Sequence, residues 1–275
     1  MKISVLMSVY EKEKAEYLIE ALNSIKNQSV KVDEFIIVKD GLLTLELDDV
    51  LSEFEENCRD LKIVTVQLKT NIGLGLALNE GLKFCNYEWI MRMDSDDISR
   101  INRVEIMKRG VLKDNFNHDV YGSHYEEFFD NSKNRQTRKV KLLHDDILLD
   151  LRKKNPMNHV TICAKKQSII DAGGYKDFKS FEDYFLWARM LKYGFKFMNI
   201  DDITVDVRIG DLMFEKRRGW FYFKQEFLMQ RYLFKSKLTS LFDFCINCSI
   251  RCSVRLMPIF LIKIIYNISR KLRYL

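Results

Sequence analysis

The stretch WIMRMDSDDIS, residues 89–99, decides the fold, because an apolar run of strand length ends directly in a cluster of acids. Asp94, Asp96 and Asp97 fall within four positions. Like charges at this spacing repel one another unless a cation, a hydrogen-bond network or a helix N-terminus compensates them. We therefore expect a buried strand whose carboxyl end holds a ligand.

Apolar runs of strand length alternate with stretches of helical period over the first hundred residues. This alternation predicts consecutive βα units and a mostly parallel sheet. In open α/β sheets, ligands bind at the carboxyl ends of the strands, which is where Asp94 would lie. The expected strands are residues 3–10, 34–41, 61–68 and 87–93, and the expected helices are residues 15–28 and 72–85.

The regular alternation fades after the acid cluster. We expect one α/β domain over residues 1–205, followed by a helical, basic extension over residues 206–275. Within the first domain, the later segments read as a helix (101–115), a strand (119–129), a polar connection (134–146), a further strand (159–166) and a further helix (181–194).

The charge of the chain is unevenly distributed. The formal net charge is +6, but residues 207–275 hold 14 Lys and Arg against four Asp and Glu, a balance of +10 that leaves −4 for the rest. Arg251, Arg255 and Lys263 interrupt the apolar runs of this part before any reaches the ~18 to 20 uncharged residues of a membrane span. The mixture is typical of an amphipathic segment on an anionic membrane surface. A helix packed on the domain or on a second copy is the alternative.

The six cysteines favour a reducing compartment, because the N-terminal apolar run is too short and too polar-flanked for a signal peptide. Cys245, Cys248 and Cys252 have metal-like spacing. Three thiols without a nearby fourth ligand, in an apolar helix-like stretch, favour packing over a zinc site.

The acid cluster has a structural and a functional interpretation. Asp96, Asp97 or Ser99 could cap the helix expected after Arg100, but a cap needs one such residue rather than three acids. Two hard carboxylates at a strand end can instead bind Mg²⁺ or Mn²⁺ and leave coordination positions for a substrate diphosphate. We favour the metal site.

Two further segments could line a ligand site at the same edge of the sheet. Asp40 ends the second expected strand, and its carboxylate could accept hydrogen bonds from a nucleobase or ribose, although Asp-Gly is also common in turns. Asn71 and Gly73 precede a helix, where backbone N–H groups can approach a ligand closely. Neither segment is specific by itself.

Taken together, five segments in this order and spacing resemble the large family 2 of inverting glycosyltransferases, with its Rossmann-like GT-A fold. They are ISVLMSVYE (3–11), FIIVKDG (35–41), NIGLGLALNEGL (71–82), WIMRMDSDDIS (89–99) and FEDYFLWARM (181–190). The resemblance spans residues 1–205, which would form the catalytic domain, and is closest to bacterial members that build O-antigen, capsule and other surface polysaccharides.

The resemblance implies a role for each matching residue. Asp94 and Asp96 resemble the family's DxD pair, one near the ribose and one on the metal that bridges the diphosphate, with Asp97 in support. Asp183 matches the catalytic base, which removes the proton of the acceptor hydroxyl, and Glu182 precedes it. The remaining donor-site residues would be Ser8, Tyr10 and Glu11 around the nucleotide, Asp40 on uracil, Asn71 and Gly73 lining the pocket, and Arg92 close by.

Four residues are candidates for the acceptor or a diphosphate. His159 falls where relatives often carry a His near the acceptor, and a packing role is equally compatible with the sequence. Arg208, Arg217 and Arg218 could grip the diphosphate of the donor or of a lipid-linked acceptor, since guanidinium suits phosphate. A solvated basic face is the alternative.

The resemblance implies metal-dependent transfer, with Mn²⁺ or Mg²⁺, from a UDP-sugar to a sugar on an undecaprenyl diphosphate carrier at the inner face of the cytoplasmic membrane. Galactose or glucose is the favoured donor sugar, and an N-acetylhexosamine the favoured acceptor. A sugar nucleotidyltransferase would need a Gly-rich phosphate loop near the N-terminus, which is missing from SVYEKEKAEY (8–17). A non-catalytic or nucleic-acid-binding protein is disfavoured, because the acids would repel phosphate without a metal.

Overall fold

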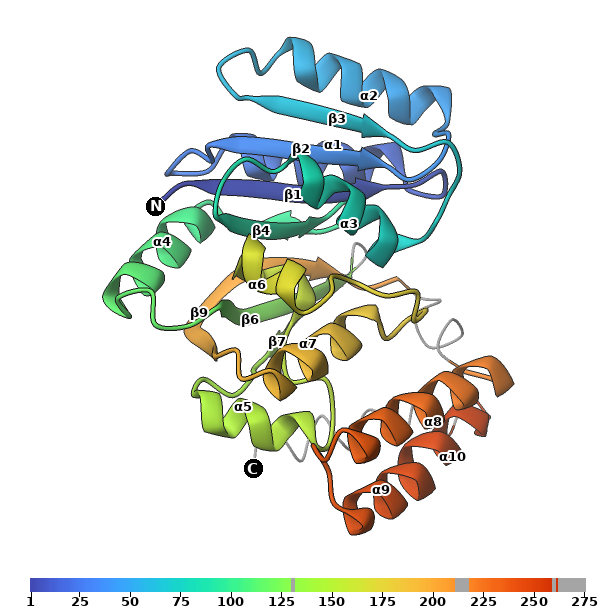
Figure 1. Cartoon of the computed structure of the whole chain (residues 1–275). Helices are drawn as coiled ribbons and strands as arrows, with labels where there is room; N and C mark the ends of the chain where they lie inside the picture. Colours follow the sequence, from blue (N-terminus) through green and yellow to red (C-terminus); the bar gives the residue numbers. More distant parts are fainter. Residues whose placement is uncertain (130–131, 211–217, 259–260, 262–275) are drawn as a thin grey trace. The chain divides into compact units, whose positions relative to one another are not determined.

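The computed structural model describes residues 1–129, 132–210, 218–258 and 261 (Figure 1). The chain forms two compact units. The first consists of Met1–Asp177 and Glu182–Arg208, and the second consists of Phe178–Phe181 and the chain from Ile209 onward. The first unit contains the sheet, and the second is helical where it is described.

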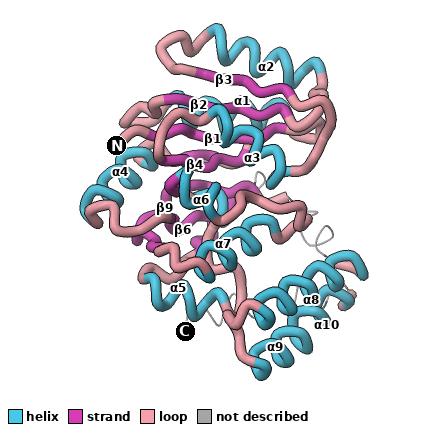
Figure 2. The backbone as a smooth tube through the Cα atoms, in the orientation of Figure 1, coloured by secondary structure: helices cyan, strands magenta, loops and turns pink. Residues whose placement is uncertain are grey.

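A single nine-stranded mixed sheet runs through the first unit, as Figure 2 shows in magenta. The strand order is β3-β2-β1-β4-β8-β6-β9-β5, with β7 paired to β6. The strands are β1 (Ile3–Val9), β2 (Glu34–Lys39), β3 (Ile63–Gln67), β4 (Trp89–Asp94), β5 (Ile98–Ser99), β6 (Val120–Phe129), β7 (Ser132–Arg138), β8 (Cys163–Lys165) and β9 (Phe197–Arg208).

The first four strands are mutually parallel, as the βα alternation predicts. Because parallel neighbours end on the same side, the carboxyl ends of β1, β2 and β4 share one edge of the sheet (Figure 1). Beyond β4 the sheet is mixed, since β8 runs antiparallel to both β4 and β6 while β6 and β9 are parallel. The expectation of a mostly parallel sheet therefore holds for its N-terminal half.

Helices cover both faces of the sheet. The apolar faces of α1 (Ala15–Lys26), α2 (Leu45–Glu56) and α4 (Arg103–Lys113) form one core with alternate residues of β1, β2 and β4. The helix α3 (Leu74–Phe84) packs on the opposite face, where Gly81 lets it approach closely: a Cβ there would lie 2.4 Å from Leu6 Cδ1. Strand alternation thus sends successive side chains of β1 to two different cores.

The structure corrects two sequence-based expectations and confirms a third. Residues 134–146, read as a polar connection, contain the end of β7 and the start of α5 (His144–Leu151). Residues 159–166, read as one strand, begin with a 3-10 turn, η1 (His159–Thr161), before the short β8. The helix expected over residues 181–194 is confirmed as α7 (Glu182–Lys192), and Gly194 follows it with a left-handed φ of 87°.

The second unit is built from α8 (Trp220–Lys235), α9 (Leu241–Asn247), a π-helical turn η4 (Cys248–Cys252) and α10 (Ser253–Leu256). The helix α9 begins with a capping box, in which Ser240 and Asp243 satisfy each other's backbone N–H groups. No helix among the described residues combines the length and the apolar character that crossing a membrane requires.

Candidate functional site

The acid cluster lies where β4 ends, at the carboxyl edge of the parallel strands. Asp94, Asp96 and Asp97 each offer a carboxylate oxygen, and these three atoms lie within 4.8 Å of one another. Two oxygens bound to one Mg²⁺ or Ca²⁺ are each about 2.0–2.6 Å from the ion, so they cannot be more than about 5 Å apart. The cluster therefore has the right ligand type and spacing for a hard divalent cation.

Arg92 and Asp94 form a paired charge within the cluster. Nη1 of Arg92 donates to Oδ2 of Asp94 at 2.7 Å, and Nη2 donates to Oδ1. The Arg92 side chain is 5% exposed and the Asp94 side chain is 30% exposed. Arg92 is therefore buried, whereas Asp94 is partly accessible to solvent. The buried Arg103 fixes the strand beneath it by donating to the carbonyl oxygens of Arg92 and Val160.

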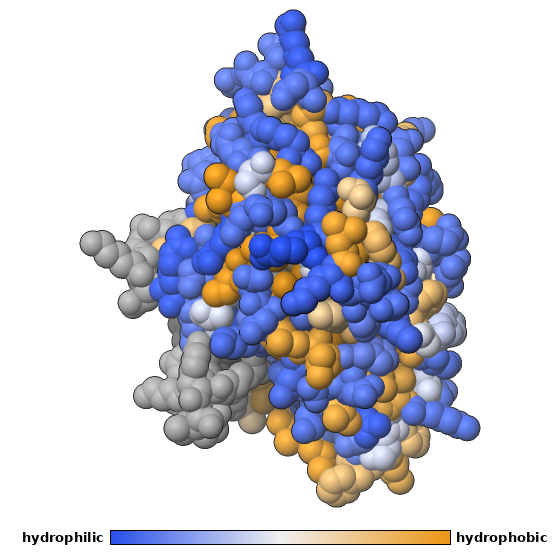
Figure 3. Space-filling view, turned by 90° about the vertical axis from the view of Figure 1, so that its left-hand side faces the viewer, coloured by the Kyte–Doolittle hydropathy of each residue, from blue (hydrophilic) through white to orange (hydrophobic). Residues whose placement is uncertain are grey.

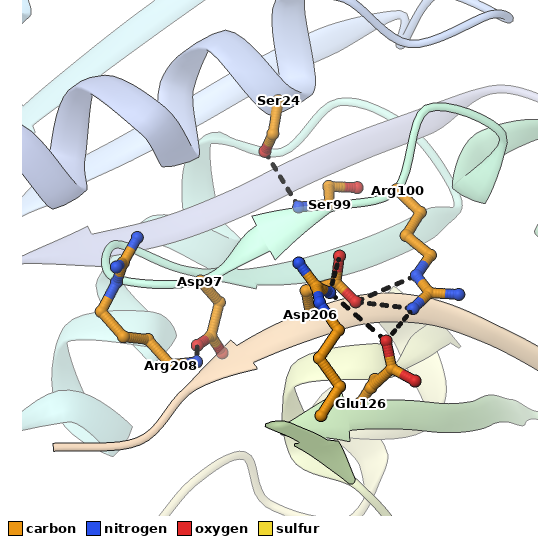
Figure 4. A network of polar contacts seen from close by, with 8 residues as sticks. Ser24, Asp97, Ser99, Arg100, Glu126, Asp206 and Arg208 are labelled. Atoms are coloured by element: carbon orange, nitrogen blue, oxygen red, sulfur yellow. Dashed lines mark hydrogen bonds and ion pairs between the residues drawn. The ribbon is translucent and has the colours of Figure 1, made fainter. Parts of the chain in front are cut away.

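Asp97 connects the acid cluster to the end of β9. Its Oδ1 accepts the backbone N–H of Arg208 at 2.9 Å (Figure 4). In addition, Nε of Arg208 donates to the carbonyl of Asp96 at 3.1 Å. The Arg208 guanidinium also pairs with Glu20 and lies 4.0 Å from the centroid of the Tyr17 ring. Through these contacts Arg208 fixes the position of Asp96 and Asp97 relative to the end of β9.

A second polar network fixes the chain just after the acids, as Figure 4 shows. Arg100 donates through Nε and Nη2 to Asp206 on β9 and through Nη2 to Glu126 on β6. The Ser99 N–H donates to Oγ of Ser24 on α1 at 3.0 Å. The loop between β4 and α4 is thus tied to three separate elements, so the acids are held in a preorganised arrangement.

Crowding shifts the ionisation of the cluster. Burial raises the pKa of Asp96 to about 7, and the negative charges of Asp94 and Glu13 add to this. Burial also raises the pKa of Asp97 well above its ordinary value, with Asp96 and Asp94 adding to the rise. Glu13 reaches the cluster through Ser95, whose hydroxyl donates to it at 2.5 Å. A divalent cation would relieve this repulsion directly.

The predicted nucleotide residues lie around the same edge. Ser8, on β1, is in register with Val38 of β2 and Asp94 of β4, next to the first acid of the cluster. Tyr10 follows the strand, and burial raises the pKa of its hydroxyl, with further contributions from Glu13 and Asp96. Glu11 is exposed on the following turn.

Asp40 organises the loop before α3. It is 3% exposed, and its two carboxylate oxygens accept the backbone N–H groups of Ile72 at 2.7 Å and Gly73 at 3.0 Å. Gly41 makes this contact possible, since it has a φ of 91° and a Cβ there would lie 2.7 Å from the nitrogen of Asn71. Asp40, Asn71 and Gly73, which are distant in sequence, therefore form one local structure.

Asp183 lies in the first turn of α7, where the helix dipole favours a negative charge. Nδ2 of Asn155 donates to its Oδ2 at 2.6 Å, and Oδ1 accepts the N–H of Tyr184 at 2.7 Å. Glu182 packs against α3: a Cβ on Gly75 would lie 3.0 Å from Cβ of Glu182. Glu182 thus contacts the helix that follows the Asp40 loop, while Asp183 is held by Asn155.

His159 and Tyr175 form a hydrogen-bonded pair. Nε2 of His159 lies 2.8 Å from the Tyr175 hydroxyl, and its ring also packs edge-on against Trp187 at 5.9 Å. Burial lowers the pKa of His159 well below its ordinary value, and Arg92 lowers it further, so the imidazole is neutral. The pair is therefore a hydrogen-bonding unit within the fold and carries no charge.

The Tyr175 hydroxyl lies within electrostatic reach of both groups of acids. Burial raises its pKa above the ordinary value. The other charges that act on it, in falling order, are those of Arg92, which lowers the pKa, and of Asp183, Glu182 and Asp94, which raise it. Asp94 and the two acids that begin α7 thus act electrostatically on the same buried side chain.

Arg217 and Arg218 are the remaining two candidates for binding a diphosphate. Arg217 lies outside the described residues. Arg218 belongs to the second unit and is exposed. The cysteines of that unit do not gather around a metal position: the one group of three possible ligands within the described parts of the chain is the acid cluster.

Sequence reasoning missed Asn155, Tyr175 and Asn79. Asn79 clamps the turn before Tyr175, accepting its N–H at 2.8 Å and donating to its carbonyl at 2.7 Å. The dipeptide Gly173–Gly174, with left-handed φ values of 82° and 63°, was the available signal for a tight turn at this place. Nothing in the sequence around Asn155 indicates that it reaches Asp183.

Comparisons with known proteins agree with this geometry. Residues 4–174 match the model of Glycosyl transferase family 2. The amylovoran biosynthesis glycosyltransferase AmsE of Erwinia amylovora is 35% identical over 98% of this chain and 99% of its own length. The Escherichia coli UDP-Gal:alpha-D-GlcNAc-diphosphoundecaprenol beta-1,3-galactosyltransferase is 37% identical over 94% of this chain and 92% of its own length.

Solved structures show the same fold at lower identity. The crystal structure of S. aureus TarS 1-349 in complex with UDP-GlcNAc superposes with a TM-score of 0.64 and 20% identity, covering 84% of this chain and 66% of that one. In another crystal structure of S. aureus TarS, the match spans 40% of that chain. The likeness shows a GT-A-like mixed sheet with flanking helices.

Proposed function

This chain belongs to glycosyltransferase family 2, and from that premise we propose that it is an inverting, metal-dependent hexosyltransferase of bacterial surface polysaccharide synthesis. It would move galactose or glucose from a UDP-sugar to a sugar on a lipid diphosphate, in the assembly of an O-antigen or capsular polysaccharide. It would work at the inner face of the cytoplasmic membrane, without spanning it.

One arrangement carries this proposal. The acid cluster of β4 and the acids that begin α7 both act on the same buried side chain, since Asp94, Asp183 and Glu182 all raise the pKa of Tyr175. A transferase that inverts configuration needs one acidic site for the leaving diphosphate and a separate base for the attacking hydroxyl. The two groups of acids in this chain fit that division of roles.

The donor half of the site would be built from the strand ends. Asp94 and Asp96 are the residues that would hold Mn²⁺ or Mg²⁺, and the bound cation would neutralise the charge that develops on the leaving diphosphate. Arg92 orients the Asp94 carboxylate through its two hydrogen bonds. The loop that Asp40 holds would receive the nucleoside, with Asn71 and Gly73 at its rim.

The acceptor half would centre on Asp183. Its carboxylate takes the proton of the acceptor hydroxyl as that oxygen attacks the anomeric carbon from the face opposite the diphosphate. The bond to UDP breaks in the same step, which inverts the configuration. Asn155 directs Oδ2 of Asp183, and the helix N-terminus stabilises its charged form.

The names of two relatives support the substrate class. The E. coli protein is named for transfer of galactose to GlcNAc-diphosphoundecaprenol, and it aligns with 94% of this chain. The Erwinia protein is named for amylovoran biosynthesis. We therefore favour a UDP-hexose donor and an N-acetylhexosamine acceptor on a polyprenyl diphosphate.

A turnover panel tests the proposal. The full chain is incubated with UDP-, GDP- and dTDP-sugars and a synthetic GlcNAc-diphosphate-lipid of short, water-soluble chain, with Mn²⁺ or with EDTA. We expect transfer from one UDP-hexose only with metal, and a β-linked product by NMR from an α-linked donor. Transfer with retained configuration, or no transfer from any nucleotide sugar, would contradict the proposal.

A further inference from the structure

The second unit buries several charged and amide side chains and exposes many large apolar ones. Isolated exposed apolar residues are normal on soluble proteins, and Figure 3 shows them between hydrophilic ones on one face of the molecule. The second unit is the smaller of the two, yet among the residues that the structure describes it contributes 11 of the 24 large apolar side chains that are exposed. This excess is the first sign of a binding surface.

The interior of this unit contains charged and amide side chains beside the buried apolar Met229 and Leu233. Glu226 and Gln230, on the inner face of α8, are both 0% exposed. Arg251 and Arg255 donate to the Glu226 carboxylate at 2.6 and 2.9 Å, and Asn247 donates to Gln230 at 3.0 Å. Although burial alone would raise the pKa of Glu226, the two arginines lower it. The charged and amide groups are therefore satisfied inside the unit.

The outer face of α8 is apolar and basic. Its exposed positions fall within an arc of about 140° at the 3.6 residues per turn of an α-helix. Large apolar side chains, most of them aromatic, are interspersed with Lys and Arg at these positions. None of these three cations forms an ion pair with an acid among the described residues. The positions are Trp220, Phe221, Lys224, Phe227, Leu228, Arg231, Phe234 and Lys235.

The next helical segments continue the pattern. Leu241 and Phe242, at the start of α9, are 62% and 73% exposed, and Ile250 in η4 is 60% exposed. Buried Asn247 lies between them in sequence and points to the interior. We call the eight exposed positions of α8 the apolar-basic face, and these three residues add to the exposed apolar side chains of the unit.

We propose that the apolar-basic face docks on an anionic lipid bilayer, with its rings inserted at the level of the headgroups and its cations on lipid phosphates. This inference deepens the proposed function, on which it rests for the position of the acceptor. An apolar face without cations would suit a second copy of the chain equally well. Lys224, Arg231 and Lys235 between the rings favour a negatively charged lipid surface.

Trp220 gives the inference a direct optical test. It is 69% exposed, whereas Trp89 and Trp187, the other two tryptophans, are 1% and 0% exposed in the first unit. Brominated phospholipids quench a tryptophan only on contact, so quenching in vesicles reports Trp220 alone. We expect quenching in vesicles of brominated phosphatidylcholine with 30% phosphatidylglycerol. Absence of quenching, with the Trp220→Phe variant as the blank, would overturn the inference.

Co-sedimentation of the full chain with the same vesicles measures the contribution of each component. Each Lys or Arg at an anionic surface strengthens binding about fivefold, so Lys224→Gln/Arg231→Gln/Lys235→Gln should weaken it by about 100-fold. Phe221→Ser/Phe227→Ser/Leu228→Ser should abolish it. The matched controls replace exposed residues of the first unit: Arg59→Gln/Lys113→Gln/Lys139→Gln for the cations and Ile101→Ser/Leu143→Ser/Leu149→Ser for the apolar residues.

Two outcomes would overturn the proposal. One is that the variants of the apolar-basic face bind vesicles as well as their matched controls do. The other is that the wild type is a dimer by light scattering and the apolar variant a monomer, with vesicles unbound by either. All charge variants should keep wild-type transfer to the water-soluble acceptor, so a loss of vesicle binding is distinguishable from a failure of the proposed function.

Discussion

Asn155 Nδ2 donates a hydrogen bond of 2.6 Å to Oδ2 of Asp183, across 28 positions of sequence. The acceptor atom belongs to the carboxylate that we propose as the base. A hydrogen bond to the charged form of a carboxyl group lowers its pKa. The contact therefore keeps Asp183 ionised and fixes the oxygen that is directed away from Tyr184.

Removal of the base is the first prediction. Asp183→Asn should lower kcat by about 10²–10⁴-fold, the usual contribution of a general base. Binding of UDP with Mn²⁺ should remain within about twofold of wild type, because the donor half of the site is intact. Radiolabel transfer and calorimetry measure the two quantities, and normal turnover by the variant would exclude Asp183 as the base.

Asn155 is a positioning residue, so its loss should have a different signature. Asn155→Ala should lower kcat about tenfold and move the acid limb of the kcat/KM profile to higher pH, since the pKa of Asp183 rises when the hydrogen bond is lost. Asn155→Asp serves as a control that places a second negative charge beside the base and should move the limb further. An unshifted profile in both variants would contradict the role.

The pKa of Asp96 predicts how metal binding depends on pH. In the metal-free fold this carboxyl titrates at about 7 and is mostly protonated at pH 6. The raised pKa stabilises the metal-free fold at low pH, and this stabilisation is lost as the pH rises through about 7. Because the cation competes with that proton, the apparent Kd for Mg²⁺ should be about tenfold weaker at pH 6 than at pH 8. Calorimetry with Asp96→Asn as control checks this, and equal affinities at both pH values would refute it.

Asp97 should act on stability more than on metal binding. Its Oδ1 accepts the N–H of Arg208, and Asp97→Ala would leave that donor partly buried and unpaired. We expect a loss of about 1–3 kcal/mol in the free energy of unfolding. Asp97→Asn keeps an acceptor oxygen and should lose less. Urea denaturation distinguishes the two, and equal stability of Asp97→Ala and wild type would remove the role of Asp97 as a tether.

The N-terminal half of the fold was predictable because its signals are local. The runs ending at Val9, Lys39 and Asp94 are apolar on both faces, as strands buried between two helix layers must be. Their common direction follows from the helices between them. The acids after β4 and Asp40 after β2 could therefore be assigned to one edge before any coordinates were known.

The second half was less predictable because its strands are polar. The strand β7 reads SKNRQTR, and its arginines pair with acids of the neighbouring β6, as Arg138 does with Glu127 at 2.6 Å. The strand β9 carries acids at Asp201, Asp202 and Asp206 and continues to Arg208, past residue 205 where the sequence predicted the domain to end. Such strands are identified by their partners in the sheet, which sequence periodicity does not show.

The site follows the same division. The acid cluster and the FEDY sequence could be found from residue type and spacing. The contacts that organise them could not, because Asp97 and Arg208 are 111 positions apart and Asn155 and Asp183 are 28 apart. The burial of Glu226 and Gln230 on the inner side of α8 was also hidden, since the sequence does not show which side of this helix faces inward.

The central claim is that the acids of residues 94–97 hold a cation for the diphosphate of a UDP-sugar. Calorimetric titration of the full chain with UDP-galactose and UDP-glucose, with Mn²⁺ and with EDTA, tests it most directly. We predict that one sugar nucleotide binds at least tenfold more tightly with Mn²⁺, and that Asp96→Asn removes this gain. Equal affinity with and without metal, in both wild type and variant, would contradict the claim.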